Sequence, residues 1–123
     1  MTSFFRTIKQ FLFPISKSYD SSNNQVNNGG ISMKKISIRV VGSVQGVGFR
    51  FSTKLVADQI GVYGIVRNEP DGSVYIEANG DPEKIDLFIE KIRNSPSPSG
   101  YVDSIIVEEL PSLKIRDKFT ISN

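Results

Sequence analysis

The segment KISIRVVGSVQGVGFRFSTKLVADQIG, residues 35–61, changes its hydrophobic period from two to 3.6 across a run of glycines. Before the glycines, Ile36, Ile38 and Val40 alternate with other residues, which predicts a strand with one buried face. After them, apolar residues recur at helical spacing up to Gly61, a residue type that often follows the last turn of a helix. The residues of this expected apolar stripe are Phe51, Leu55, Val56 and Ile60. The segment therefore predicts a strand, a glycine loop and a helix.

Two β-rich runs follow, VYGIVRN at residues 62–68 and SVYIEA at residues 73–78. They are joined by EPDG, in which Pro70 favours a turn and Gly72 accepts a positive φ. Short turn signals between two such runs are typical of a β-hairpin. We therefore expect these two strands to pair.

The segment DPEKIDLFIEKIRN, residues 81–94, predicts a second helix, with Asp81 as N-cap and Pro82 at its first position. Its apolar residues follow the i, i+3, i+4, i+7 spacing. The expected buried residues are Ile85, Phe88, Ile89 and Ile92. SPSPSG at residues 95–100 ends this helix, VDSIIVEEL predicts another strand, and KFTISN predicts a short closing strand.

The resulting order is βαββαβ with a short final strand. It predicts an α+β fold of the ferredoxin-like, split βαβ type: a sandwich of an antiparallel sheet with two helices on one face. We expect residues 33–123 to form this one domain, because the polar segment SYDSSNNQVNNGG at residues 18–30 has little to bury and resembles a linker.

Residues 1–32 are expected to be a disordered or dispensable N-terminal extension, since Met33 followed by KKISIRVV resembles the natural start of a protein. The segment SFFRTIKQFLFPI at residues 3–15 nevertheless has the spacing of a short basic amphipathic helix. A transit peptide or a weak membrane-surface anchor is the alternative interpretation.

Composition narrows the possible chemistry. The chain of 123 residues has no cysteine and no histidine, which excludes disulfides, thiol catalysis, zinc bound by these residues and imidazole as a general base. The formal charge of +2 is too small and dispersed to indicate nucleic-acid binding, although it suits a small anion. No apolar run is long enough to cross a bilayer, so we expect a cytoplasmic protein without integral membrane association.

The glycine loop has the features of an anion site. Backbone N–H groups at a helix N-terminus lack intrahelical partners, and the helix dipole favours negative charge there. Gly42, Gly46 and Gly48 allow the backbone to curl and a ligand to approach, while Arg50 could bind two phosphate oxygens. A tight turn followed by a solvated arginine explains the glycines equally well. The loop matches neither the dinucleotide nor the P-loop pattern.

The run VVGSVQGVGFR, residues 40–50, followed by Asn68 in GVYGIVRNEPDGSVYIEANG, closely resembles the acylphosphatase family. The resemblance extends from Lys34 to the closing strand and implies the same ferredoxin-like fold. It implies hydrolysis of a small-molecule acyl phosphate to a carboxylate and inorganic phosphate, without metal, other cofactor or covalent intermediate. It also implies that Arg50 binds the phosphoryl group and that Asn68 orients the attacking water. The resemblance further implies that backbone N–H groups of the loop bind the phosphate. The residues that provide them are Gln45, Gly46, Val47, Gly48 and Phe49.

An acyl phosphate has a good leaving group, so positioning and charge stabilisation can lower the barrier without a strong base. Two alternatives are a noncatalytic domain that binds acyl or carbamoyl phosphate and an RRM-like RNA-binding module. The second is disfavoured because the aromatic run precedes the first helix instead of lying on the third strand. Arg67 should point to the opposite face from Asn68 by strand alternation. We expect a monomer that does not bind nucleic acid.

Overall fold

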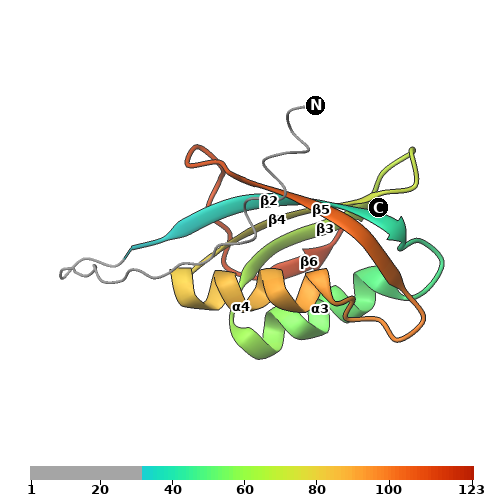
Figure 1. Cartoon of the computed structure of the whole chain (residues 1–123). Helices are drawn as coiled ribbons and strands as arrows, with labels where there is room; N and C mark the ends of the chain where they lie inside the picture. The colour runs from blue at the N-terminus through green and yellow to red at the C-terminus, as the bar shows by residue number, and fades with distance from the viewer. Residues whose placement is uncertain (1–31) are drawn as a thin grey trace.

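The computed structural model describes residues 32–123. The elements follow the expected order: β2 (Lys34–Ser43), α3 (Phe49–Ile60), β3 (Tyr63–Asn68), β4 (Val74–Gly80), α4 (Pro82–Arg93), β5 (Tyr101–Glu109) and β6 (Phe119–Ile121). Both helices lie on one face of the sheet, as Figure 1 shows. The ferredoxin-like prediction is therefore confirmed. Apart from its last residue, the extension expected at residues 1–32 lies outside the described part of the chain.

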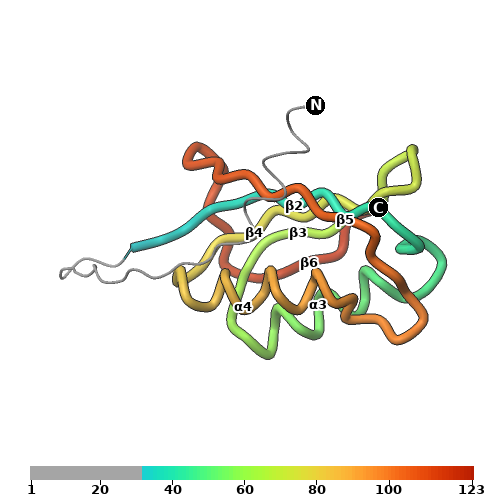
Figure 2. The backbone as a smooth tube through the Cα atoms, viewed as in Figure 1, coloured from blue at the N-terminus to red at the C-terminus, as the bar shows by residue number. Residues whose placement is uncertain are grey.

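The sheet has five strands in the order β5-β2-β4-β3-β6. The pairs β2–β4, β2–β5 and β3–β4 are antiparallel, as expected, but β6 pairs with β3 in parallel. β5 and β6 lie at opposite edges of the sheet, so the connection at residues 110–118 has to cross it (Figure 2). This crossing brings β6 to the β3 edge in the same direction as β3, and the sheet is mixed.

The core lies between the sheet and the helices. Ile85, Phe88 and Ile92 of α4 are fully buried, as predicted, and the Phe88 ring meets Phe119 of β6 edge to face with 5.9 Å between centroids. The helix also has the predicted boundary, because Asp81 is its N-cap, although only the backbone oxygen of Asp81 receives hydrogen bonds there.

The predicted buried stripe of α3 is wrong in part. Phe51 is 61% exposed and Leu55 is 46% exposed, whereas Phe49, Thr53 and Ala57 face the sheet. Small side chains at positions 53 and 57 leave the helix backbone close to the sheet, and the large Phe49 fills the space at its first turn. Periodicity favoured the larger apolar residues, so it selected the wrong face of this helix.

The carboxyl ends of β2 and β3 and the start of β4 lie at the same end of the sheet. β2 and β3 are both antiparallel to β4, so their carboxyl ends lie at the same edge. Val74, at the start of β4, pairs with Val40 on one side and with Asn68 on the other. The loop from β2 to α3 and the C-terminus lie at this same end of the molecule (Figure 1). We call this end the loop edge, defined by residues 44–50, Asn68 and Asn123.

Candidate active site

The loop between β2 and α3 keeps its backbone donors free. Gly46 and Gly48 have φ values of 77° and 78°, in the left-handed region that favours glycine. A Cβ on either residue would meet nothing within 4 Å, so backbone conformation, and not crowding, requires glycine. Among residues 32–123, the N–H groups of residues 45–49 donate no hydrogen bond. With the N-terminus of α3 beside them, these groups can bind an anion.

Gln45 contributes its side chain as well as its backbone. Its amide Nε2 donates to the carbonyl oxygens of Glu69, at 2.9 Å, and Ser73, at 2.8 Å, in the turn between β3 and β4. We expected Gln45 only as a backbone donor, and its sequence position gave no sign of this contact. The side chain therefore fastens one end of the loop to the neighbouring turn.

The turn that receives Gln45 is itself fixed by side chains. Asp71 Oδ1 accepts hydrogen bonds from Ser73 N, at 2.9 Å, and Ser73 Oγ, at 2.6 Å. Arg39 Nη1 donates to the same Ser73 hydroxyl at 2.9 Å. These interactions lower the pKa of Asp71, chiefly through the hydrogen bond from the Ser73 hydroxyl.

Arg50 extends from the first turn of α3 toward the end of the chain. Its Nη1 donates to Ser122 O at 3.2 Å, to Asn123 O at 3.0 Å and to Asn123 Oδ1 at 3.1 Å. Nε and Nη2 make no hydrogen bond to residues 32–123. Arg50 thus has one anchored nitrogen and two nitrogens left to bind a pair of oxygen atoms.

Asn68 ends β3 beside the same C-terminal residue. Its N–H donates to Asn123 Oδ1 at 3.4 Å, and its carbonyl oxygen accepts from Asn123 Nδ2 at 3.0 Å. The side-chain oxygen Asn68 Oδ1 is buried and has no partner in the described part of the chain. A buried acceptor without a partner is costly unless a ligand or water donates to it. Sequence reasoning missed Asn123, which brings Arg50 and Asn68 together.

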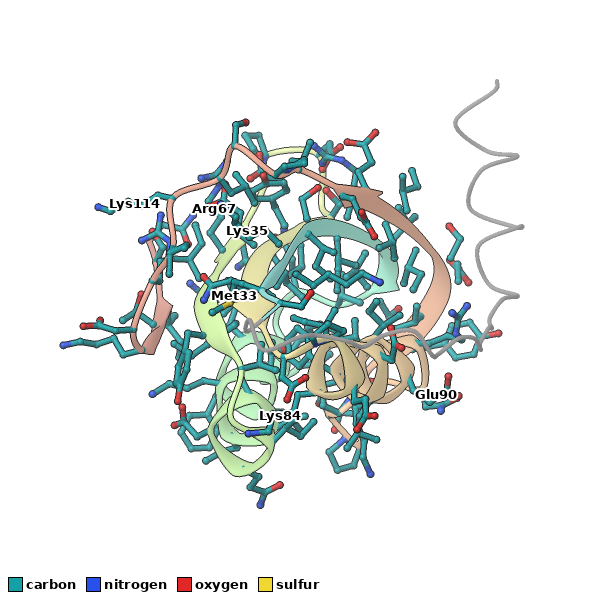
Figure 3. The ribbon with its side chains drawn as sticks, turned by 90° about the vertical axis from the view of Figure 1, so that its left-hand side faces the viewer. Met33, Lys35, Arg67, Lys84, Glu90 and Lys114 are labelled. Atoms are coloured by element: carbon teal, nitrogen blue, oxygen red, sulfur yellow. The ribbon has the colours of Figure 1, made fainter. Side chains whose placement is uncertain are left out.

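Phe49 and Arg67, the other two residues considered from the sequence, lie on different sides of the sheet. Phe49 is buried in the core, so its side chain anchors the loop, and its N–H donates no hydrogen bond to residues 32–123. Arg67 points away from the site, as predicted: its guanidinium lies 4.6 Å from the Tyr75 ring centroid and its Nε donates to Glu69 Oε2 at 2.7 Å. Figure 3 shows Arg67 with Lys35 on the side of the sheet opposite the helices. The hydrogen bond to Glu69 raises the pKa of Arg67.

The described residues have neither the pattern expected of a metal site built from acidic side chains nor that of a membrane-spanning helix. Within residues 32–123, no group of three or more acidic side chains is placed to hold a metal ion. In the same part of the chain, no helix is long and apolar enough to span a membrane.

The family model described as Acylphosphatase matches residues 36–121, which includes the glycine loop, Arg50 and Asn68. The chain belongs to the acylphosphatase family. The acylphosphatase of Enterococcus faecalis is 49% identical over 89 residues, a match that covers 72% of this chain and 98% of that relative.

Solved structures agree with this family. An acylphosphatase from Bacillus subtilis has 38% sequence identity and a TM-score of 0.70, covering 73% of this chain and 99% of its own. The match to full-length HypF, in a phosphate- and nucleotide-bound form, has 30% identity and a TM-score of 0.67. That match covers 78% of this chain and 13% of HypF. The protein is thus an acylphosphatase, a hydrolase of acid anhydrides, and neither the noncatalytic nor the RNA-binding alternative is favoured.

Proposed function

We propose that residues 45–49 and Arg50 bind the phosphoryl group of a small-molecule acyl phosphate, and that Asn68 orients the water that attacks it. The observation that carries this proposal is the meeting of Arg50 and Asn68 at one atom, Asn123 Oδ1. This contact sets the free nitrogens of Arg50 and the unpartnered Asn68 Oδ1 at the edge where the loop N–H groups are also free.

The reaction in this site needs little more than position and charge. Water attacks phosphorus, the bond from phosphorus to the acyl oxygen breaks, and the carboxylate leaves with the bonding electron pair. Loop N–H groups and Arg50 stabilise the charge on the phosphoryl oxygens. Asn68 cannot accept a proton at neutral pH, so it only orients the water. The proton passes to a phosphate oxygen, giving inorganic phosphate.

The active unit is proposed to be residues 33–123, acting as a monomer in the cytoplasm. Every candidate site residue comes from one chain, and the family match begins at residue 36. A truncated protein that starts at Met33 should hydrolyse acyl phosphates at the rate of the full chain and sediment as a monomer. Lost activity in the folded truncated protein would contradict this.

Steady-state hydrolysis of benzoyl phosphate in the presence of EDTA tests the two side chains. Arg50→Ala should lower kcat/KM by roughly 100-fold or more, because it removes charged hydrogen bonds to the phosphoryl group. Asn68→Ala should lower kcat by roughly 100-fold with a small change in KM, because it removes only the orientation of water.

Two matched control variants are available outside the proposed site. Arg67→Ala removes an arginine that points to the opposite side of the sheet, and Asn94→Ala removes an exposed asparagine after α4. Both should hydrolyse benzoyl phosphate like the wild type. A folded Asn68→Ala protein with wild-type kcat would refute the role of Asn68, and unchanged KM and kcat in Arg50→Ala would refute that of Arg50.

A further inference from the structure

The segment after α4, residues 95–100, packs against the glycine loop between β2 and α3. Ser97 is only 3% exposed, and its hydroxyl donates to the carbonyl oxygen of Val47 at 2.5 Å. The backbone of Ser97 is held in turn, because Ser97 O accepts from Ser95 Oγ at 2.8 Å and from Gly100 N at 3.1 Å. A buried hydroxyl therefore reaches the loop from a rigid support.

The carbonyl that Ser97 binds belongs to the peptide group between Val47 and Gly48. In a planar trans peptide, the C=O and the N–H point in opposite directions. Holding Val47 O on the Ser97 side thus directs the N–H of Gly48 to the other side. That N–H donates no hydrogen bond to residues 32–123. It is one of the backbone N–H groups proposed to donate a hydrogen bond to the phosphoryl group.

There is a physical reason for fixing the orientation of this peptide group. Glycine tolerates positive and negative φ almost equally, so a peptide group next to Gly48 can rotate at low cost unless its carbonyl is fixed. A rotated peptide would present its oxygen to the phosphate, which repels it. Hydrogen bonding to a carbonyl also polarises the whole peptide group, which strengthens its N–H as a donor.

We propose that Ser97 is a positioning residue for phosphate binding: its hydroxyl fixes and polarises the Val47–Gly48 peptide so that Gly48 N–H donates to a phosphoryl oxygen. The inference depends on the proposed binding of phosphate by the loop. Ser97 itself does not touch the substrate. Its effect on the reaction passes through one backbone N–H group.

The test is a titration of the full chain with inorganic phosphate. Binding is monitored by NMR through the chemical shifts of the backbone amide protons of residues 45–50. Wild type and Ser97→Ala are compared, with Ser99→Ala as the control, because Ser99 is an exposed serine two positions further along. Ser97→Ala should weaken phosphate binding and raise KM for benzoyl phosphate by about fivefold, the effect of one hydrogen bond. The phosphate-induced shift of the Gly48 amide should shrink, and Ser99→Ala should match the wild type.

A second variant protects the test against loss of folding. Ser97→Cys keeps the shape of the side chain but has a weak donor, so it should change Kd and the Gly48 shift in the same direction as alanine. Wild-type Kd and Gly48 shift in a folded Ser97→Ala or Ser97→Cys protein would overturn the role of Ser97 alone. A wild type whose residues 45–50 show no phosphate-induced shift would overturn the proposed phosphate site and this inference with it.

Discussion

Asn123 occupies the position between the two side chains proposed for catalysis. Its side chain accepts from Arg50 and from the backbone of Asn68, and it donates to the Asn68 carbonyl. A single amide group therefore sets the distance between the guanidinium and the end of β3. Because Nη1 of Arg50 is engaged here, the proposed substrate is left with Nε and Nη2, which would fix the direction from which Arg50 binds a phosphoryl group.

Replacing Asn123 tests this bridge at the residue scale. Asn123→Ala should lower kcat/KM for benzoyl phosphate by about fivefold, because the hydrogen bonds that align Arg50 and Asn68 are lost while both residues remain. Steady-state kinetics on the folded variant provide the measurement, with Asn94→Ala as the control. An equal or higher kcat/KM would mean that Asn123 competes with the substrate for Arg50.

The sequence predicted the two proposed catalytic residues and missed the residues that support them. Arg50 and Asn68 stand in recognisable local motifs. Asn123 contacts Arg50 across 73 positions, and Ser97 contacts Val47 across 50 positions. No local pattern marks either residue, because each contact exists only after β6 has paired with β3 or α4 has packed on the sheet.

At the scale of the element, the turn between β3 and β4 acts as a support for the loop. Asp71 and Arg39 hold the Ser73 hydroxyl, and the carbonyl oxygens of Glu69 and Ser73 hold the Gln45 side chain. The hydrogen bonds from Gln45 therefore link the glycine loop to this ordered turn. The turn also introduces a pH-sensitive group, Asp71.

Stability should depend on pH through Asp71. Its pKa in the folded protein lies below the ordinary value of 3.8, so the carboxylate stabilises the fold above about pH 4. This contribution is lost as pH falls through the lower folded-state pKa. The unfolding midpoint of the wild type should exceed that of Asp71→Asn at neutral pH, and the difference should narrow at acidic pH. Chemical denaturation at several pH values measures it.

A suitable control for this comparison is Asp103→Asn, which removes one exposed negative charge from β5. A constant difference between wild type and Asp71→Asn at all pH values would show that Asp71 acts through packing and not through its charge.

Elements differed in how far the sequence predicted them. The stripe of α4 was clear, because large apolar residues occupy its buried positions and charged residues occupy most of the others, with Leu87 as an exposed exception. In α3 the buried positions include Thr53 and Ala57, while Phe51 and Leu55 are exposed, so hydrophobicity indicated the wrong face. The parallel pairing of β6 was missed as well, since pairing direction depends on where the connection at residues 110–118 crosses the sheet.

For the molecule as a whole, the core joins the helices to the last strand. Phe88 of α4 is fully buried against Phe119 of β6, and both lie in the same cluster as Ile36 and Ile38 of β2. The loop edge is built on this cluster, because Phe49 at the end of the glycine loop belongs to it too. Loss of core packing should therefore weaken the fold and the support of the loop edge together.

Two phenylalanines allow a matched test of this packing. Phe88→Ala should lower the free energy of unfolding by about 3–5 kcal/mol, because it removes a fully buried aromatic side chain. Phe51→Ala, at a residue that is 61% exposed, should change it by less than about 0.5 kcal/mol. Denaturant unfolding of both variants measures the difference, and comparable losses would refute the assignment of the core face of α3.

The bridge at Asn123 also has a consequence for synthesis. Arg50 precedes its partner by 73 positions, so a nascent chain that still holds residue 123 inside the ribosomal exit tunnel cannot align its guanidinium with Asn68. Contacts between residues far apart in sequence form late, because closing the intervening chain has a high entropic cost. The bridge at the loop edge should therefore form only after translation has passed β6, and a partly made chain should hydrolyse acyl phosphates more slowly than the complete one.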